Sequence, residues 1–195
     1  MPFEIDEQVV YPAYGVGRIV GLVMKPYLQD EARLYYEIAI GKSTMWVLVE
    51  AAGGAKGLRP ITPKADLARY RDVLRSRPVS FTTDARHRQM EVVGRLRMGT
   101  FLGICEVVRD LSARGWDRPP GDTEFALLRK TRDALCEEWM ASEGVPMLTA
   151  IAEVDALLVE ARQTYFTAGK PVASKSRAKP PALARARNEV RKTRL

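Results

Sequence analysis

Two glycine-rich stretches are the first places in this sequence where chemistry could be expected. Residues 15–21 (GVGRIVG) approach a dinucleotide-binding fingerprint, and residues 53–57 (GGAKG) approach a phosphate-binding loop. The first stretch is followed by β-branched, strand-like residues, so no helix N-terminus is available to bind a pyrophosphate. The second lacks the Walker spacing and the Ser or Thr that should follow its lysine. We therefore interpret both stretches as turns and loops.

Side chains for acid–base or metal chemistry are scarce. His87 is the one histidine of the sequence, which argues against a histidine-based triad and a multi-histidine metal site. Glu137 and Glu138 are neighbours in a helical pattern, where adjacent side chains point apart, so we interpret them as a solvated face. Cys105 and Cys136 both fall in helical patterns and are interpreted as buried free thiols. We expect no catalytic residue, no metal and no cofactor.

The basic residues are more informative. The chain carries 31 Lys and Arg against 24 Asp and Glu, a formal net charge of +7. Residues 168–195 hold nine bases and one acid, a net charge of +8, and residues 69–101 hold eight arginines and three acids, a net charge of +5. Residues 102–167 hold seven bases and twelve acids, a net charge of −5. This distribution predicts a polarised surface, one part of which attracts polyanions.

Four arginines of the basic stretch fall in one expected helix, at positions 86, 88, 95 and 97. Arg88 and Arg95 are seven residues apart and share a helix face, which the other two flank. Guanidinium groups on an exposed face are suited to bidentate contacts with phosphates. The alternative is a solvated helix whose charge is neutralised by the acidic residues of 102–167. Composition alone leaves both interpretations open.

The elements that must position these residues change type near Thr62. Residues 7–50 contain short, partly alternating runs of β-branched and aromatic residues, which predict four or five antiparallel strands in a small barrel or curled sheet. From Thr62 onward the apolar residues recur at helical spacing. Caps and prolines predict helices over about residues 62–77, 83–99, 100–114, 122–144 and 146–165, with Thr62 and Asp122 as caps. The fold class is therefore α+β, with the β part first.

Helical spacing also predicts which side chains face inward. On the second helix these are Met90, Val93 and Leu96, and on the fourth they run from Phe125 to Trp139. The other two tryptophans keep two interpretations each. Trp46 is either core or the exposed aromatic of an edge strand that meets a partner. Trp116, in the connector 115–121, either caps the helical core or is exposed.

Several short motifs then indicate a family. These are VVYP at residues 9–12, GVG at residues 15–17, GLRP at residues 57–60 and CEVVRDL at residues 105–111. In this order and spacing they make the chain resemble the CarD/CdnL family over about residues 3–160. The resemblance implies a transcription factor that binds RNA polymerase and has no enzymatic activity. It also implies that the N-terminal part is a Tudor-like barrel and that the second part is a helical domain.

The resemblance further implies how the barrel works. In the family it docks on a lobe of the polymerase β subunit by pairing strand edges, which is a form of β-augmentation. Lys25 matches a basic position used on that side. The family's strand at 44–49 carries an arginine and then Val-Pro, whereas this chain has TMWVLV. The expected polymerase-binding residues are Lys25, Thr44, Met45, Trp46, Val47 and Leu48.

For the helical domain, the resemblance implies contact with promoter DNA at the upstream edge of the transcription bubble. There a tryptophan wedges into the minor groove beside basic residues, which favours the melted state. The corresponding position here is Ala85, which is too small to act as a wedge. Phe81 is a substitute if its loop is rearranged. The expected DNA-binding residues are Arg86, His87, Arg88 and Arg95.

The sequence thus predicts three parts: a polymerase-binding barrel at 1–60, a DNA-facing helical domain at 61–166 and a disordered basic tail at 167–195. With the wedge position vacant, we predict that residues 168–195 supply part of the DNA affinity by sequence-independent phosphate contacts. The partners expected are the RNA polymerase β subunit and promoter DNA, with the chain a cytoplasmic monomer away from membranes. Two alternatives are a protein–protein adaptor with another partner and a non-specific DNA-binding protein.

Overall fold

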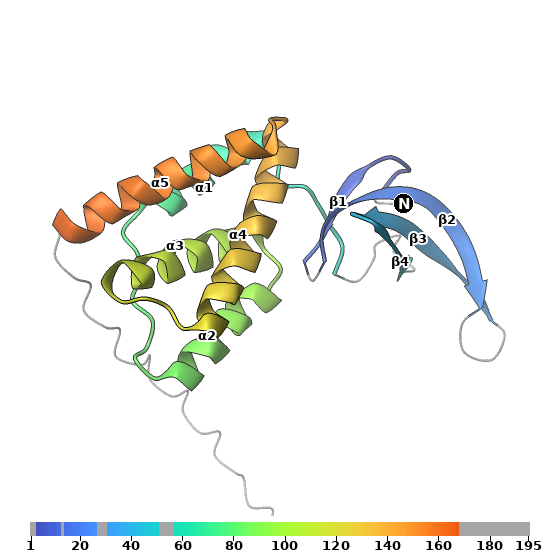
Figure 1. Ribbon diagram of the computed structural model, residues 1–195. Coiled ribbons are helices and arrows are strands. Elements are labelled where there is room, and N and C mark those ends of the chain that lie inside the picture. The colour runs from blue at the N-terminus through green and yellow to red at the C-terminus, as the bar shows by residue number, and fades with distance from the viewer. Residues whose placement is uncertain (1–2, 13, 27–30, 51–56, 168–195) are drawn as a thin grey trace, which may run out of the picture.

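The computed structural model describes residues 3–12, 14–26, 31–50 and 57–167, in which an antiparallel sheet precedes a bundle of helices (Figure 1). The sheet and the bundle lie side by side, and residues near 60 connect them. The predicted α+β fold, with its β part first, is confirmed. The basic residues 168–195, and the GGAKG stretch up to Lys56, lie outside the described residues.

The sheet is antiparallel with strand order β4-β3-β2-β1-β5, in which β1 to β4 are sequential neighbours and β5 returns to pair with β1. Its strands are β1 Gln8–Tyr11, β2 Gly15–Pro26, β3 Ala32–Ile40, β4 Ser43–Leu48 and β5 Arg59–Pro60. The long strand β2 arcs across it (Figure 1), with an irregularity in its pairing to β3 between Ile19 and Gly21. A Cβ on Gly17 would lie 2.7 Å from side-chain atoms of Ile38, so only glycine allows this close packing.

Alternation along the strands gives the sheet one buried face. Its core consists of Phe3, Val9, Ile19, Tyr36, Ile38, Val47 and Leu58. The ring of Phe3 meets that of Tyr36 edge to face, with centroids 5.8 Å apart. Because β4 contributes to this core, the strand is fixed to the sheet although it lies at the edge.

The helical part has five α-helices among the described residues. They are α1 Leu67–Arg75, which follows a 3₁₀ turn at Lys64–Asp66, then α2 Ala85–Arg97, α3 Phe101–Asp117, α4 Asp122–Glu143 and α5 Met147–Thr167. The side chain of Asp84 caps α2 and that of Thr100 caps α3. Gly144 ends α4 with a φ of +75°, a left-handed conformation that favours glycine. None of the described helices is long and apolar enough to span a membrane.

The core of the bundle forms where α1, α3, α4 and α5 meet. Trp139 and Cys105 are fully buried there, and Cys136 is nearly so. The predictions that Trp139 is a core residue and that both cysteines are buried free thiols are therefore confirmed. Burial raises the pKa of the Cys105 thiol well above its usual value.

Some predicted helix faces are wrong. Met90 is 62% exposed, whereas its neighbour Val92 is buried, so α2 is rotated relative to the predicted face. Phe125 is 56% exposed and lies outside the inward stripe of α4. The predicted connector is also shorter, because α3 continues to Asp117 and carries Trp116 in its last turn. Trp116 is half-buried and meets the ring of Tyr165 edge to face at 5.5 Å, as the capping interpretation requires.

An ion pair joins the sheet to the bundle. Arg59 in β5 holds the Glu138 carboxylate of α4 with two parallel hydrogen bonds of 2.6 and 2.7 Å. Its Nε also donates to the backbone oxygen of Gly99 at 2.7 Å. Thr62 donates to the same carboxylate from its backbone and its hydroxyl, instead of capping a helix. Glu138 is thus buried, and its predicted place on a solvated face is wrong.

Candidate protein and nucleic-acid interfaces

The free edge of β4 carries an exposed aromatic side chain. Trp46 is 45% exposed and lies opposite Glu37 of β3. The Nζ of Lys25 lies 3.2 Å from the centroid of the Trp46 ring, a cation–π contact between β2 and β4. Trp46 is therefore an exposed aromatic of the edge strand and the core alternative is wrong, whereas its contact with a partner stays a prediction. This pair forms an amphipathic patch, which we call the Lys25–Trp46 patch.

The other predicted residues of β4 divide between the two faces of the sheet. Thr44 is exposed and Leu48 is half-buried, and both share the outer face with Trp46. Met45 is half-buried and Val47 is buried, with Val47 in the core of the sheet. The side chain of Val47 therefore supports the strand from inside and does not reach a partner.

The first turn of α2 brings together the predicted wedge position and two of the predicted DNA-binding residues. Ala85, Arg86 and His87 are all exposed there. The His87 ring Nδ1 lies 2.9 Å from Oδ1 of Asp84, and the hydrogen bonds from the backbone and ring of His87 lower the pKa of that carboxyl. Arg86 and Arg97 line a shallow groove on the exposed side of α2, with Met90 and Val93 between them.

Arg88 and Arg95 face the other way. Arg88 is 9% exposed and donates to the backbone oxygens of Thr82 and Thr83 at 3.1 Å. Its Nε lies 3.4 Å from the Glu124 carboxylate of α4. Our prediction that Arg88 lies on an exposed face is therefore wrong. The Glu124 carboxylate explains the difference, because it compensates the charge of an arginine that is removed from water.

Arg95 is held in the same way by α3. It pairs with Asp110 at 2.9 Å and with Glu91, one turn earlier on α2, at 2.6 Å. Burial disfavours its charge, but these carboxylates outweigh burial and raise the pKa of Arg95. The Arg95 guanidinium also lies 5.1 Å from the ring of Phe81. Phe81 is buried in a small cluster with Val92 and so does not replace the missing wedge in this arrangement.

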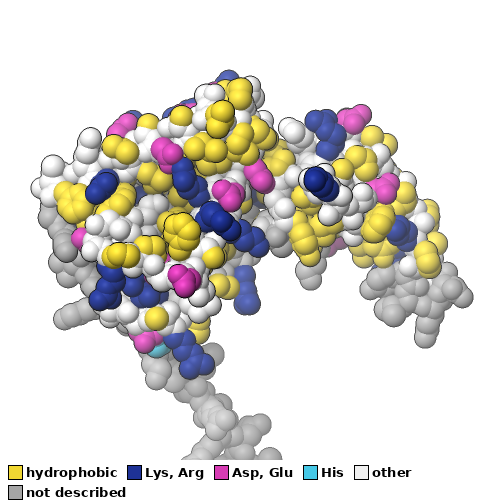
Figure 2. Space-filling model, viewed as in Figure 1, with side chains coloured by type: hydrophobic (Ala, Val, Ile, Leu, Met, Phe, Trp, Pro, Cys, Tyr) yellow, Lys and Arg dark blue, Asp and Glu magenta, His cyan; other side chains and the backbone are white. Residues whose placement is uncertain are grey.

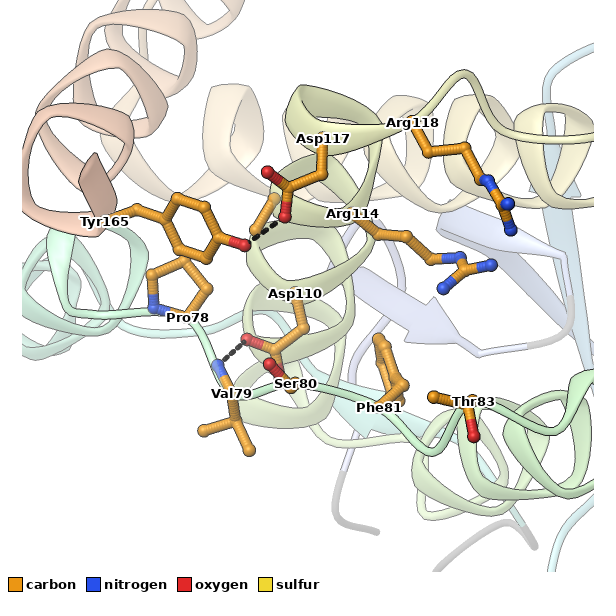
Figure 3. Close-up of a pocket in the computed structure, with 11 residues that line it drawn as sticks. Pro78, Val79, Ser80, Phe81, Thr83, Asp110, Arg114, Asp117, Arg118 and Tyr165 are labelled. Carbon is orange, nitrogen blue, oxygen red and sulfur yellow. Dashed lines mark hydrogen bonds between the residues drawn. The ribbon is translucent and has the colours of Figure 1, made fainter. Parts of the chain in front are cut away.

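A pocket lies between the segment 78–83 and the C-terminal half of α3 (Figure 3). Its carboxylates are engaged in bonds that hold the bundle together. Asp110 accepts the backbone N–H of Val79 at 2.9 Å, and Asp117 accepts the hydroxyl of Tyr165. Burial and this hydrogen bond raise the pKa of Tyr165 to about 12. Neither a histidine nor a cysteine lines the pocket, and the described residues contain no group of His, Cys, Asp and Glu able to hold a metal.

The junction residues Arg59, Thr62 and Glu138 were not recognised as a unit from the sequence. The only signal was the GLRP motif, which contains Arg59 and marked the end of the β part. Its partner is 79 residues away in the chain, beyond the reach of any local pattern. The sequence analysis therefore selected residues of β4 and α2 but missed the Arg59–Glu138 ion pair that joins the sheet to the bundle.

Comparison with known proteins is consistent with this two-part arrangement. A family model described as "CarD-like/TRCF RID domain" matches residues 3–62, and one described as "CarD, C-terminal domain" matches residues 69–155. The chain is also similar to a "Putative transcription factor YdeB" of Bacillus subtilis (strain 168). The identity is 23% over 144 residues, which cover 73% of this chain and 94% of that protein.

Proposed function

The chain belongs to the CarD family, and from this premise we propose that it regulates transcription by binding RNA polymerase and promoter DNA at the same time. The family is of transcription-factor type and is not an enzyme family. The observation that carries the proposal is the Lys25–Trp46 patch beside the edge of β4, along which no further strand pairs among the described residues. In this proposal the protein acts in the cytoplasm and modulates the stability of the open promoter complex.

The polymerase contact is assigned to the edge of β4 and to the side chains on its outer face. A partner strand from the polymerase β subunit would pair with the free backbone groups of β4. Trp46 supplies an aromatic anchor beside this edge, and Lys25 adds a positive charge. Thr44 and Leu48 complete the contact on the outer face, Met45 contributes through the backbone of the edge, and Val47 holds the strand in place from the core.

The DNA contact is assigned to the exposed side of α2. Arg86 and His87 lie in its first turn, and Arg97 lies three turns further along the exposed side. Arg88 and Arg95 act as supports, since their guanidinium groups are bound to neighbouring helices. With Ala85 at the wedge position, phosphate contacts supply most of the affinity, so binding depends strongly on salt.

Fluorescence anisotropy on a labelled promoter fork, with and without RNA polymerase holoenzyme, tests this function. We expect holoenzyme to tighten the complex, and Trp46→Ala to weaken the polymerase-dependent part by about tenfold or more because it removes a central aromatic anchor. Val20→Ala, at an equally exposed apolar residue of β2, is the control and is expected to change little. Equal binding with and without polymerase, at low salt only, would identify a non-specific DNA-binding protein.

A second candidate function is a protein–protein adaptor on the same scaffold. It is favoured by one observation, the small and exposed Ala85 where the resemblance implies a wedge. In the same experiment an adaptor would bind neither the fork nor the polymerase complex.

A further inference from the structure

The last helix of the bundle is apolar on more than one side. Val154, Leu157 and Ala161 of α5 are buried in the bundle. On its outer side, Leu148 is 80% exposed, Val159 is 54% exposed and Phe166 is 52% exposed. Large apolar side chains that gather on the exposed side of a helix indicate a surface for a partner. The bundle covers only one side of α5, so its outer side has apolar surface for which the chain provides no cover within the described residues.

Part of this surface forms a groove of about 460 Å³ where α3, α4 and α5 meet, which we call the α3–α5 groove. Figure 2 shows hydrophobic side chains gathered over α5 and over the surface between α5 and α4, with Lys and Arg side chains among them. The apolar lining of the groove consists of Trp116, Phe125, Leu128, Leu158 and Val159. Phe125 is the residue that the sequence pattern placed in the core, and its exposure is explained if this groove has an occupant.

The rim of the α3–α5 groove is basic. Its polar lining has three arginines against one aspartate, a net charge of +2, with Ser112 as the neutral member. Arg132 pairs with Asp155, but its Nε is buried and has no hydrogen-bond partner within the described structure. Arg129 and Arg162 are exposed, and the Arg162 guanidinium lies 5.8 Å from the ring of Phe166. The groove therefore combines an apolar floor with cationic walls.

We propose that the α3–α5 groove is a docking site for an acidic amphipathic helix of a partner protein. Such a helix would place its apolar side on Leu128 and Leu158 and direct its carboxylates to the arginines of the rim. Charge complementarity selects this occupant and rejects residues 168–195 of the same chain, which carry a net charge of +8. This surface is separate from both the Lys25–Trp46 patch and the exposed side of α2.

A nucleic acid fits the groove less well, although it is also an anion. Single strands bind where successive bases stack on exposed aromatic rings. Three of the five apolar residues in the floor are aliphatic and offer no π face. The ring of Trp116 is already occupied by an edge-to-face contact with Tyr165. The aliphatic floor favours leucine-like side chains over bases.

The test uses the full chain and a fluorescein-labelled synthetic helix with leucines at i, i+3, i+4 and i+7 and glutamates at the other positions. A second peptide has lysines in place of the glutamates. We expect saturable binding of the glutamate peptide alone, and the double variant Arg129→Glu/Arg162→Glu is expected to weaken it by about tenfold or more. Phe125→Ala is expected to weaken it as well, because it removes part of the apolar wall.

Matched controls lie outside the groove. Leu148→Ala removes an exposed apolar side chain from the same helix, and Arg69→Glu reverses an exposed charge on α1. Both are expected to leave peptide binding within about twofold of the parent. Equal binding of the two peptides, no binding of either, or no effect of the arginine variant overturns the proposal.

Parallel measurements on the same proteins test two other occupants of the α3–α5 groove, a second copy of this chain and a nucleic acid. Sedimentation velocity that shows a dimer broken by Val159→Glu would make the groove a contact between two copies of this chain and overturn the proposal. Displacement of the peptide by a short oligo(dT), lost in the Arg129→Glu/Arg162→Glu variant, would make it a nucleic-acid site and do the same. None of these binding and sedimentation measurements involves polymerase, so their results do not depend on whether the chain binds polymerase.

Discussion

The carboxylate of Glu138 accepts four hydrogen bonds, which come from two side chains and one backbone group. Arg59 supplies a two-bond fork, and Thr62 supplies its N–H and hydroxyl. The carboxylate is almost inaccessible to solvent, whereas the Arg59 side chain is 23% exposed. Removing one partner of such a pair costs far more than the pair contributes, because the remaining charge stays buried.

We expect Glu138→Gln to lower the free energy of unfolding by about 2–4 kcal/mol, since the amide keeps the shape but leaves the Arg59 charge without a counter-charge. Urea unfolding of the full chain measures this change. Glu137→Gln, at the half-buried neighbouring residue, is the matched control and should cost less than about 1 kcal/mol. Equal losses in the two variants would show that Glu138 is not the critical acid of α4.

Tyr165 makes stability depend on pH in the alkaline range. Burial and the bond to Asp117 raise its pKa to about 12, above the value of about 10 for an unfolded tyrosine. A phenol with a raised folded-state pKa contributes fully below about pH 10 and loses that contribution as the pH rises toward about 12. The unfolding free energy of the parent should therefore fall over this range more steeply than that of Tyr165→Phe.

Urea titrations at a series of pH values measure the difference between the two proteins. Tyr14→Phe, at a tyrosine that is 59% exposed, controls for the loss of a hydroxyl. Parallel curves for the parent and Tyr165→Phe between about pH 10 and 12 would rule out this linkage.

At the scale of elements, the arginines of α2 have two different roles, because some face the bundle and others face solvent. Arg88 faces inward and Arg86 faces outward. Arg88→Ala should cost about 2–3 kcal/mol, because the carbonyls of Thr82 and Thr83 lose their donor and Glu124 keeps only its pair with Arg114. Arg86→Ala should change stability by no more than about 0.5 kcal/mol.

DNA binding should respond in the opposite way. Under the proposed function, Arg86→Ala lowers the salt slope of fork binding by about one, the value for a single phosphate contact. Salt titrations of fork binding, together with urea unfolding of both variants, measure the two effects. If the Arg88→Ala variant is as stable as the parent and has a lower salt slope, Arg88 contacts DNA, and the assignment of Arg88 to support and Arg86 to DNA binding is wrong.

Local signals explain which helix boundaries could be predicted. Asp84 and Thr100 cap α2 and α3 through bonds to residues three positions ahead, and Gly144 ends α4, so these boundaries are visible in the sequence. The rotation of α2 depends on Asp110 and Glu124, which lie on other helices. No periodicity of α2 itself reveals these partners. The same applies to Phe125, whose exposure belongs to a surface formed by three helices.

At the scale of the whole molecule, the sheet and the bundle present their surfaces in one fixed arrangement. The Lys25–Trp46 patch lies on the sheet, and the exposed side of α2 lies on the bundle, with Arg59 between the two parts. Two binding surfaces on one body raise each other's effective concentration only when their spacing fits both partners. Under the proposed function, we therefore expect the junction at Arg59 to affect the combined binding more than either separate contact.

Arg59→Lys isolates this effect, because lysine keeps the charge near Glu138 but loses the two-bond fork and the bond to Gly99. Under the proposed function, we expect the variant to bind polymerase alone, and the fork alone, within about twofold of the parent. The tightening of fork binding by holoenzyme should fall severalfold, since a looser junction lowers the effective concentration of one surface near the other's partner. Arg18→Lys is the control, because the Arg18 guanidinium bonds to the backbone of Asp6 within the sheet part. If Arg59→Lys keeps the full effect of holoenzyme, the two surfaces bind independently, and the ion pair between sheet and bundle serves stability alone.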